Sequence, residues 1–308
     1  QRKSTTAPVL WPQATIVKSA DEVFADKSIE LVVVNTPNET HFEYASKALE
    51  AGKHVIVEKP FTVTTAEADQ LIAIANKSKR LLTVFQNRRW DGDFLTVKKI
   101  IAEGAVGRIA EFELHYDRFR NYIEPNTWKE EGGRGSGILY NLGSHMLDQV
   151  LALFGMPVEV DARVGIQREG GRVEDFYDVR LRHPTFYTIV KSSYLVREQG
   201  PRYILHGNDG SFVKYGIDPQ EQALKDGVLP GSPGWGSEPA EFWGKLTNAE
   251  GVKRIETIPG NYLAFYENVF DAIRNGKPLA VRPEESRDGI RMIEACYESN
   301  RLRKAIAL

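Results

Sequence analysis

The sequence predicts two domains: an α/β domain with a doubly wound parallel sheet over residues 1–106, and an α+β domain with an open, mostly antiparallel sheet over residues 107–308. Three observations predict this division. Strand and helix patterns alternate as far as residue 104, and residues 108–118 then alternate polar and apolar side chains along one long strand. Beyond a single amphipathic helix, four extended segments joined by short turns are typical of an antiparallel sheet.

The first domain is organised around residues 31–60. Residues 31–34 are an unbroken apolar run, typical of a strand buried on both faces, and turn residues end it at 36–38. A helix follows, and a second strand extends over 54–57. Two strands joined by one helix form a right-handed parallel crossover, whose ligands lie at the carboxyl ends of the strands. We therefore expect a site at Thr36-Pro37-Asn38 and Glu58-Lys59-Pro60.

The other elements follow from the same patterns. In the first domain we expect a strand at 14–17, a helix at 21–24 capped by Asp21, and a helix at 64–75 that ends at Ala75. A strand at 81–85, a loop at 87–91 and a helix at 94–102 should follow. In the second domain we expect a strand at 108–118 and a helix at 139–154. Four extended segments should follow at 158–164, 176–182, 185–196 and 202–206. Helices at 262–274 and 283–301 complete the chain, and the last should pack back.

Composition excludes several classes of function. The 308 residues are 42% hydrophobic with a formal net charge of −2, and the basic residues are dispersed, so we expect no nucleic-acid partner and no membrane partner. No apolar run reaches spanning length, and the polar start is not a signal peptide. The one cysteine, Cys296, cannot form an internal disulfide and is read as a buried structural thiol. A reducing cytoplasm fits this composition best.

The front of the chain lacks an expected motif. A doubly wound nucleotide-binding domain needs a glycine-rich loop after its first strand, yet the first glycine is Gly52. We interpret the sequence as beginning late, since a βαβ unit of about 30 residues would fit upstream of Gln1. Residues 1–4 would then follow the second strand, where the adenosine ribose is bound. Arg2 and Ser4 there favour the 2′-phosphate of NADP over NAD; the alternative is an exposed basic loop.

Lys59 is the first candidate catalytic residue. It ends a buried strand beside Glu58 and should point into the crevice between the domains. An ammonium group there can hydrogen-bond a substrate hydroxyl, and partial desolvation would lower its pKa and allow proton transfer. The alternative is a strand-end ion pair followed by a proline stop.

A second candidate cluster lies on the helix at 139–154. Asn141 and His145 are four residues apart and Asp148 is three further on, which predicts one helical face. Near neutral pH, His145 can take a proton from an alcohol while hydride leaves its carbon, whereas the Asn141 amide can only position its neighbours. The alternative is a structural histidine under the sheet.

Other candidates are weaker. Arg88, Arg89 and Trp90 could pack on a nicotinamide or a phosphate, although a packing cluster at the strand end is the favoured explanation. A polyol-binding site could be lined by residues at and after the end of the strand at 108–118: Tyr116, Asp117, Arg118, Arg120 and Trp128. The glycines at 133, 135 and 137 have the wrong spacing for a dinucleotide fingerprint and predict a turn, a nest or a lid. Nothing has metal-ligand spacing.

These motifs together resemble the glucose-fructose oxidoreductase / inositol dehydrogenase family, in its NADP-dependent scyllo-inositol dehydrogenase branch. The motifs that carry the resemblance are Thr36-Pro37-Asn38-x-x-His41, Ala51-Gly52-Lys53-His54-Val55, Glu58-Lys59-Pro60, Asn87-Arg88-Arg89-Trp90-Asp91, and Gly137 through His145 to Asp148-Gln149. The resemblance implies a nucleotide domain followed by a sheet whose outer face dimerises, with Lys59 and His145 as the family's lysine and histidine. The family's aspartate falls on Asn141, which should lower the pKa of His145.

The sequence thus predicts an oxidoreductase that moves a hydride between NADP and a secondary hydroxyl of a cyclic polyol or sugar. Catalysis is assigned to Lys59, His145 and Asn141, and the last two also contact the substrate. Cofactor binding is assigned to Arg2, Ser4, Thr36, Pro37, Asn38, His41, Glu58, Lys59, Arg89 and Trp90. Because of Asn141, a weak or inactive dehydrogenase-like sensor stays the alternative, as does a purely structural dimer.

Overall fold

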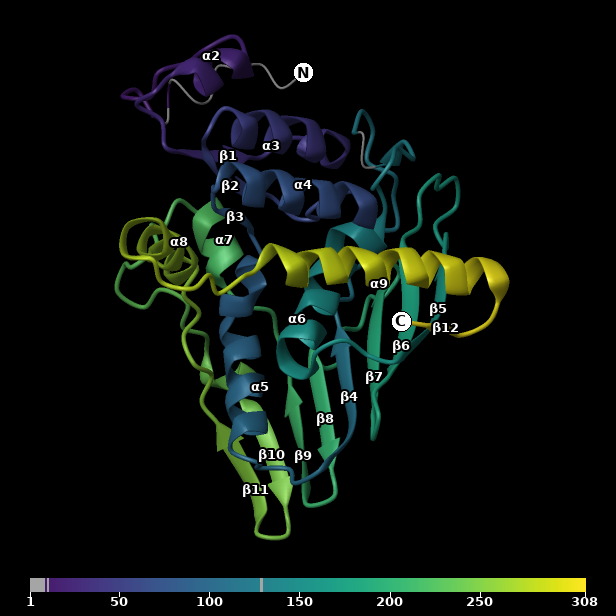
Figure 1. Cartoon of the computed structure of the whole chain (residues 1–308). Helices are drawn as coiled ribbons and strands as arrows, with labels where there is room; N and C mark the ends of the chain where they lie inside the picture. Colours follow the sequence, from purple (N-terminus) through teal and green to yellow (C-terminus); the bar gives the residue numbers. More distant parts are fainter. Residues whose placement is uncertain (1–8, 10, 128–129) are drawn as a thin grey trace.

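A parallel three-stranded sheet forms the first part of the structure, a computed structural model that describes residues 9, 11–127 and 130–308 (Figure 1). Its strands β1 (Leu31–Val34), β2 (His54–Val57) and β3 (Leu82–Val84) lie in that order, with both neighbouring pairs parallel. Helix α3 (His41–Glu50) connects β1 to β2, and α4 (Thr65–Ser78) connects β2 to β3. The predicted parallel crossover is confirmed.

Apolar periodicity explains why these elements pack. Val55, Ile56 and Val57 on β2 are fully buried, as expected of a strand covered on both faces. On α3 the buried residues are His41, Ala45, Ala48 and Leu49, which recur on one helical face. The α4 helix begins with a capping box, in which Thr64 Oγ1 accepts from Glu67 N and the Glu67 carboxylate accepts from Thr64 N.

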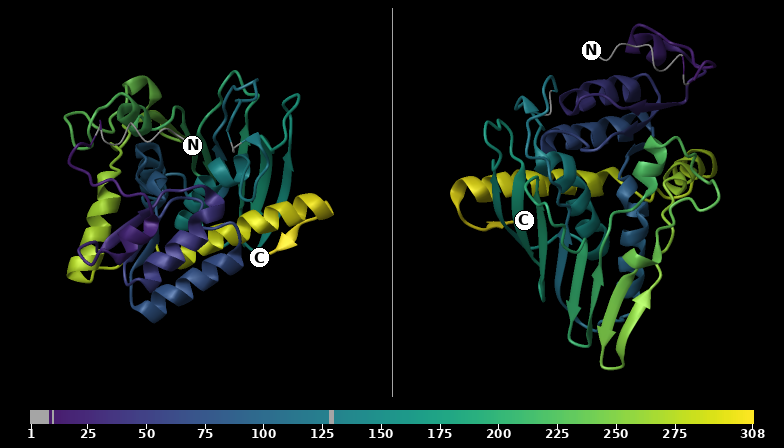
Figure 2. Two further views of the ribbon diagram at one scale, coloured as in Figure 1. Left: turned by 90° about the horizontal axis from the view of Figure 1, so that it is seen from above. Right: turned by 180° about the vertical axis from the view of Figure 1, so that it is seen from behind.

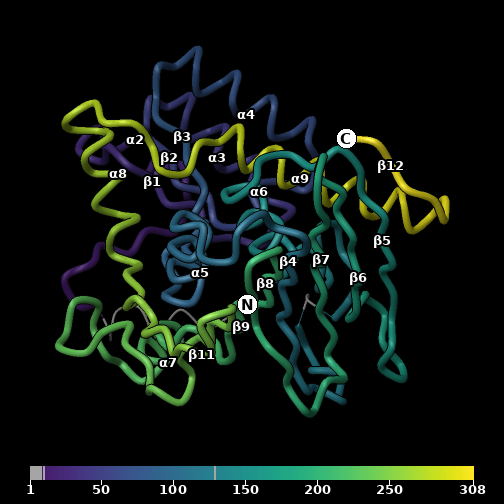
Figure 3. Tube along the Cα trace, turned by 90° about the horizontal axis from the view of Figure 1, so that it is seen from below, coloured from purple at the N-terminus to yellow at the C-terminus, as the bar shows by residue number. Residues whose placement is uncertain are grey.

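A nine-stranded sheet forms the second part. Its order is β11-β10-β9-β8-β4-β7-β6-β5-β12, and only β4 and β7 pair in parallel. The strands are β4 (Ile109–His115), β5 (Glu159–Gly165), β6 (Phe176–Arg182), β7 (Tyr187–Ser193), β8 (Tyr203–Gly207), β9 (Gly210–Lys214), β10 (Gly244–Asn248), β11 (Gly251–Ile255) and β12 (Ile306–Ala307). The predicted open, mostly antiparallel sheet is therefore confirmed, and Figure 3 shows β12 beside β5 at its edge.

Helices cover one face of this sheet and connect it to the parallel sheet. The α6 helix (Ser144–Phe154) lies against β7, and α9 (Pro283–Leu302) packs on β5, α6 and α4. Figure 2 shows α9 alongside α4 and across the end of the larger sheet. The last helix therefore packs back, as predicted. The remaining helices are α2 (Ala20–Ala25), α5 (Gly92–Ala102), α7 (Gln220–Lys225) and α8 (Leu263–Asn275), with short turns η1 (Asn38–Thr40), η2 (Asn87–Trp90) and η5 (Ala240–Phe242).

Three local predictions were wrong. Residues 14–17 form no strand, because they pair with no neighbouring strand. The cap of α2 is Ser19, not Asp21, because the Ser19 side chain accepts from a backbone N–H while Glu22 completes a capping box. The helix predicted over 139–154 is interrupted, since Leu139–Gly143 forms a π-helical turn, η4, before α6 begins. The described part of the chain contains no helix with the length and apolar character needed to cross a membrane.

Candidate active site

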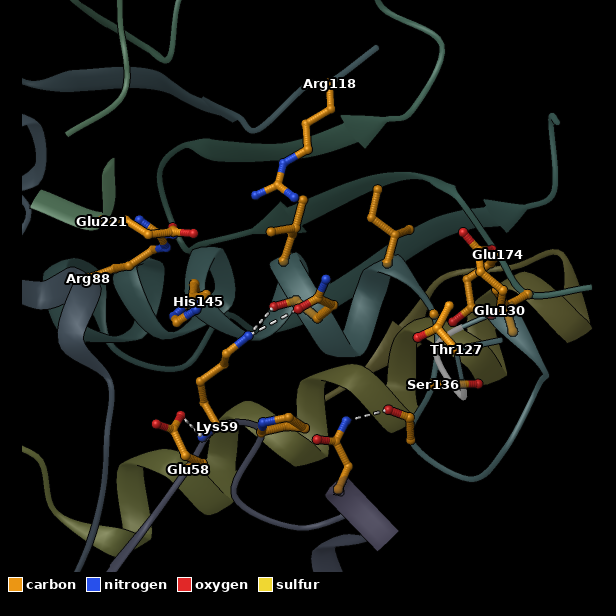
Figure 4. A pocket seen from close by; sticks show the side chains of 18 of the residues that line it. Glu58, Lys59, Arg88, Arg118, Thr127, Glu130, Ser136, His145, Glu174 and Glu221 are labelled. Carbon is orange, nitrogen blue, oxygen red and sulfur yellow. Dashed lines mark hydrogen bonds and ion pairs between the residues drawn. The ribbon is translucent and has the colours of Figure 1, made fainter. Parts of the chain in front are cut away.

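A cavity of about 580 Å³ lies where the parallel sheet meets the larger sheet (Figure 4). The parallel sheet contributes the residues that follow the carboxyl ends of β1, β2 and β3, among them Asn35, Thr36, Glu58, Lys59 and Phe85. The opposite wall comes from segments of the larger sheet and from helix α6, including Arg118, Arg120, Tyr194 and His145. The cavity therefore has the position expected for a ligand site of an open parallel sheet.

Lys59 reaches into this cavity and contacts Asn141 through two hydrogen bonds. Its Nζ donates to the backbone oxygen of Asn141 at 3.0 Å and to the side-chain Oδ1 of Asn141 at 3.1 Å. Asn141 lies in the π-helical turn η4, whose wider backbone hydrogen bonding releases carbonyl groups from their usual helical partners. The lysine predicted from a strand end and the asparagine predicted from a helix are thus joined.

His145 lies in the first turn of α6, lines the same cavity and is only 4% exposed. Its Nδ1 is buried and has no hydrogen-bond partner in the described part of the chain. Burial holds the pKa of His145 well below its ordinary value, and the positive charges of Lys59 and Arg88 lower it further. The imidazole is therefore neutral near pH 7 and able to accept a proton.

We expect an NMR titration of the His145 ring to give a pKa well below the ordinary 6.5. Replacement of Lys59 by glutamine removes a nearby positive charge, so Lys59→Gln should raise that pKa. Lys47→Gln is the matched control, because Lys47 is an exposed lysine on α3. A His145 pKa at or above 6.5, or one that Lys59→Gln leaves unchanged, would contradict this electrostatic description.

The same shift affects stability. Because the pKa of His145 is lower in the folded chain than in an unfolded one, the unfolded chain binds the proton more readily. The contribution of His145 to the free energy of unfolding is thus complete above pH 6.5 and is lost as the pH falls toward the folded-state pKa.

Asp148 does not share the cavity with Asn141 and His145, contrary to the predicted common face. Its carboxylate accepts from Arg89 Nη2 at 2.7 Å and from Arg89 Nε at 2.8 Å. Asp148 lies three residues after His145 on the regular helix α6, so the two side chains are rotated by about 60° around its axis, and the ion pair with Arg89 holds Asp148 outside the cavity.

The predicted cofactor residues separate into two groups. Thr36, Asn38, His41 and Glu58 line the cavity with Lys59. His41 is fully buried and joins the two strand ends, with Nδ1 2.8 Å from Pro60 O and Nε2 3.0 Å from Thr36 O.

The second group lies elsewhere or beyond the described residues. Pro37, Arg89 and Trp90 do not line the cavity in the described part of the chain: the carbonyl of Pro37 accepts from Thr40, the Arg89 guanidinium binds acidic side chains, and Trp90 packs on Phe265. Arg2 and Ser4 lie outside the described residues.

The predicted substrate residues are also divided. Arg118 and Arg120 line the cavity, whereas Tyr116 is 2% exposed and supports the guanidinium groups stacked on its ring. Asp117 accepts from the backbone N–H of Ser193 at 2.9 Å and does not line the cavity in the described part of the chain. Trp128 lies outside the described residues.

The structure places Arg88, one of the weaker candidates from the sequence, in the cavity wall, and it adds Arg168, which the sequence did not indicate. Arg88 forms an ion pair with Glu221 at 2.7 Å, and Arg168 forms one with Glu130 at 2.9 Å. These partners lie far apart in sequence, so no spacing rule could pair them. Arg88 was indicated as a candidate in the loop after a parallel strand, whereas no sequence signal indicated Arg168.

The glycine segment at 133–137 crosses the edge of the cavity as a loop. Gly135 has φ +71°, a backbone conformation that favours glycine, and its carbonyl accepts from Asn38 Nδ2 at 2.7 Å. A β-carbon at this position would lie 3.0 Å from Val63. The segment therefore acts as a turn that connects the larger sheet to the end of β1.

The described residues contain no group of three or more His, Cys, Asp or Glu side chains that could hold a metal ion.

A parallel sheet with a lysine at a strand end, an opposing sheet and a neutral buried histidine in one cavity define the class: an NAD(P)-dependent dehydrogenase of two-domain type. The chain belongs to the GFO/IDH/MocA oxidoreductase family. The family model described as "Oxidoreductase family, NAD-binding Rossmann fold" matches residues 2–86, and the model of the "C-terminal alpha/beta domain" matches residues 98–308.

Individual relatives agree with this assignment. The scyllo-inositol 2-dehydrogenase (NADP(+)) IolW of Bacillus subtilis is 43% identical over 302 residues, which cover 97% of this chain and 84% of the relative. The uncharacterized oxidoreductase YdgJ of Escherichia coli is also 43% identical over 302 residues, covering 97% and 86%. The solved structure of the oxidoreductase yvaA from Bacillus subtilis superposes with a TM-score of 0.95 at 40% identity, covering 99% of this chain and 89% of that one.

Proposed function

We propose that the chain transfers a hydride between NADP and a secondary hydroxyl of a cyclic polyol or sugar of the inositol type. The observation that carries this proposal is that Lys59 and His145 line one cavity at the carboxyl ends of the parallel strands. The printed name of the relative IolW, which specifies scyllo-inositol and NADP, supports the substrate class and the cofactor.

The residues present fit a nicotinamide nucleotide. The cavity opens along the ends of all three parallel strands, and the His145 Nδ1 atom is buried there without a partner in the described part of the chain. Thr36, Asn38 and Glu58 would hold the nucleotide, which supplies the two-electron acceptor for alcohol oxidation. Arg2 and Ser4, outside the described residues, are proposed to bind the 2′-phosphate that distinguishes NADP from NAD.

The roles of the chain's own residues follow from their chemistry. The Lys59 ammonium donates to the backbone oxygen and to the side-chain oxygen of Asn141, which orient it, and it would donate to the substrate hydroxyl when substrate binds. His145, neutral because its pKa is lowered, would take the hydroxyl proton. Asn141 is thus a positioning residue for Lys59 as well as a candidate contact for the substrate.

The domain boundary, the oligomeric state and the cellular location of the chain are further proposals. We place the domain boundary between residues 106 and 107, in the segment before β4. We propose that the outer face of the larger sheet forms a homodimer or higher oligomer, which light scattering on the purified chain would test. A reducing cytoplasm suits the buried free thiol of Cys296, and localisation of a tagged chain would test it.

The direct test is an assay of the purified protein with a panel of inositols and aldoses and with NADP or NAD. We expect reduction of the nucleotide, detected by its absorbance, with a larger kcat/KM for NADP than for NAD. Arg2→Ala should reduce that preference, because the 2′-phosphate loses a cationic partner. Absence of turnover with every polyol and both nucleotides would reject the proposal.

A further inference from the structure

The wall formed by the larger sheet presents two guanidinium groups to the cavity. Arg118 and Arg120 follow β4, and we call them the wall arginines. The guanidinium carbon of Arg118 lies 5.1 Å from the ring centre of Tyr116, and that of Arg120 lies 5.7 Å from the ring centre of Tyr194. In Figure 4, Arg118 enters the pocket from the side opposite Lys59. The wall arginines stack on aromatic rings. A ring contacts the face of a guanidinium and does not accept hydrogen bonds from the five N–H groups in the guanidinium plane.

The backbone that carries the wall arginines is fixed. The backbone N–H of Arg118 donates to Ser193 O at 2.9 Å, and that of Arg120 donates to Tyr194 O at 2.8 Å. Between them, Phe119 forms a β-bridge with Leu195. The wall arginines therefore belong to an ordered extension of the sheet, and their side chains need little reorganisation to bind a ligand.

Other arginines of the cavity have acidic partners. Arg88 binds Glu221 at 2.7 Å, and Arg168 binds Glu130 at 2.9 Å. By contrast, no carboxylate oxygen of the described residues lies within 4.0 Å of a guanidinium nitrogen of a wall arginine, whereas Arg88 and Arg168 each have a carboxylate within that distance. The positive charges of the wall arginines are therefore not neutralised by the described part of the protein.

The remaining acidic residues of the cavity do not change this balance. Glu58 lies next to Lys59 on the opposite wall, Glu124 is exposed to solvent, and Glu174 accepts the hydroxyl of Tyr297. Arg118 is also close enough to His145 to contribute to lowering the pKa of that imidazole, so the positive field of the wall extends to the proposed acid/base group.

We propose that the substrate carries an oxyanion, a carboxylate or a phosphate, which Arg118 and Arg120 bind while a hydroxyl elsewhere on the molecule reacts. Within the polyols and sugars of the proposed function, the preferred substrate class is then a sugar acid or a phosphorylated sugar or polyol. A planar guanidinium matches both oxyanions with two parallel hydrogen bonds, and charge-assisted bonds are about twice as strong as neutral ones. This inference rests on the proposed function, because both concern one cavity.

The test compares three sugars that differ by one group: D-glucose, D-glucuronate and D-glucose 6-phosphate. We expect at least one anionic sugar to exceed D-glucose in kcat/KM with NADP by roughly 10- to 100-fold, the range of a charged hydrogen bond. The glucuronate and phosphate arms distinguish the two sources of the oxyanion. Isothermal titration calorimetry of each sugar into the wild-type chain gives the same ranking without turnover.

Variants assign the preference to the wall. Arg118→Gln and Arg120→Gln should raise KM for the anionic sugar by a larger factor than KM for D-glucose, and Arg118→Lys should retain part of the preference. Arg180→Gln is the matched control, because Arg180 is an exposed arginine on β6. Circular dichroism verifies folding, and Arg118→Lys remains informative if Arg118→Gln does not fold.

The outcomes separate this inference from the proposed function. Turnover of D-glucose equal to or better than that of both anionic sugars would overturn the inference and leave the dehydrogenase proposal standing, as would an equal loss for charged and uncharged sugars in Arg118→Gln. Calorimetric binding of D-glucuronate or D-glucose 6-phosphate that depends on Arg118 would support the inference even if no nucleotide were reduced. Equal or absent calorimetric binding of all three sugars would count against it.

Discussion

Replacement of His145 by asparagine should lower kcat for alcohol oxidation by about 10²- to 10⁴-fold, the usual contribution of a general acid/base. His145 lines the cavity with Lys59 and carries a neutral imidazole at pH 7 because burial and nearby cations lower its pKa. An asparagine amide can occupy the position but cannot take a proton. Steady-state kinetics with NADP and the best polyol, together with nucleotide binding measured by calorimetry, should show a loss in kcat with binding retained.

His183 provides the matched control for this prediction. It is equally buried at 3% exposure, also has a ring nitrogen without a hydrogen-bond partner in the described part of the chain, and stacks on Phe186 away from the cavity. His183→Asn should affect stability but not kcat. Equal losses of kcat in His145→Asn and His183→Asn would show that a buried histidine is needed for folding and not for chemistry.

The second large effect concerns stability: Asp148→Ala should reduce the free energy of unfolding by about 3–5 kcal/mol. Asp148 is 2% exposed and forms two hydrogen bonds with Arg89, whose side chain is only 10% exposed. Removal of the carboxylate leaves a buried guanidinium without its main partner. Urea denaturation of the wild type and the variant measures the difference.

Burial also limits what this ion pair contributes. The pKa of Asp148 is raised, because burial outweighs the attraction of Arg89. Joint replacement by apolar residues, Arg89→Met with Asp148→Leu, should therefore recover most of the loss. Glu285→Gln is the control, because the partly exposed Glu285 is the weaker partner of Arg89, and it should cost less than about 1 kcal/mol. A cost for Asp148→Ala no larger than that control would contradict the prediction.

Prediction from sequence succeeded where a local pattern is sufficient. The strand at 176–182 was predicted with its observed bounds, because side chains alternate along it, and β1, α3 and β2 follow from apolar periodicity. It failed at 14–17, where a short apolar run has no partner strand. It also missed β9, β10 and β11. Most residues of β10 and β11 are exposed or half-buried, so these short strands lack a clear alternation of apolar and polar side chains.

The candidate site shows the same limit. Lys59 and His145 could be predicted separately, one from a strand end and one from a helix, and their shared cavity followed from the rule for parallel sheets. The pairing of Arg89 with Asp148 could not be predicted, because the two residues are 59 apart in the sequence and lie on separate elements, η2 and α6. The pairs of Arg88 with Glu221 and Arg168 with Glu130 join residues distant in sequence, so only the assembled fold brings them together.

The sequence by itself determined the order of most strands and helices, the parallel and antiparallel character of the two sheets, and the residue types able to bind and deprotonate an alcohol. These depend on periodicity and side-chain chemistry, which are local properties. Only the tertiary structure decided which charges are neutralised. Arg88 and Arg168 have carboxylate partners, whereas Arg118 and Arg120 have none in the described part of the chain. The physical reason is that an ion pair depends on distances of a few ångströms, which the packing of both sheets sets.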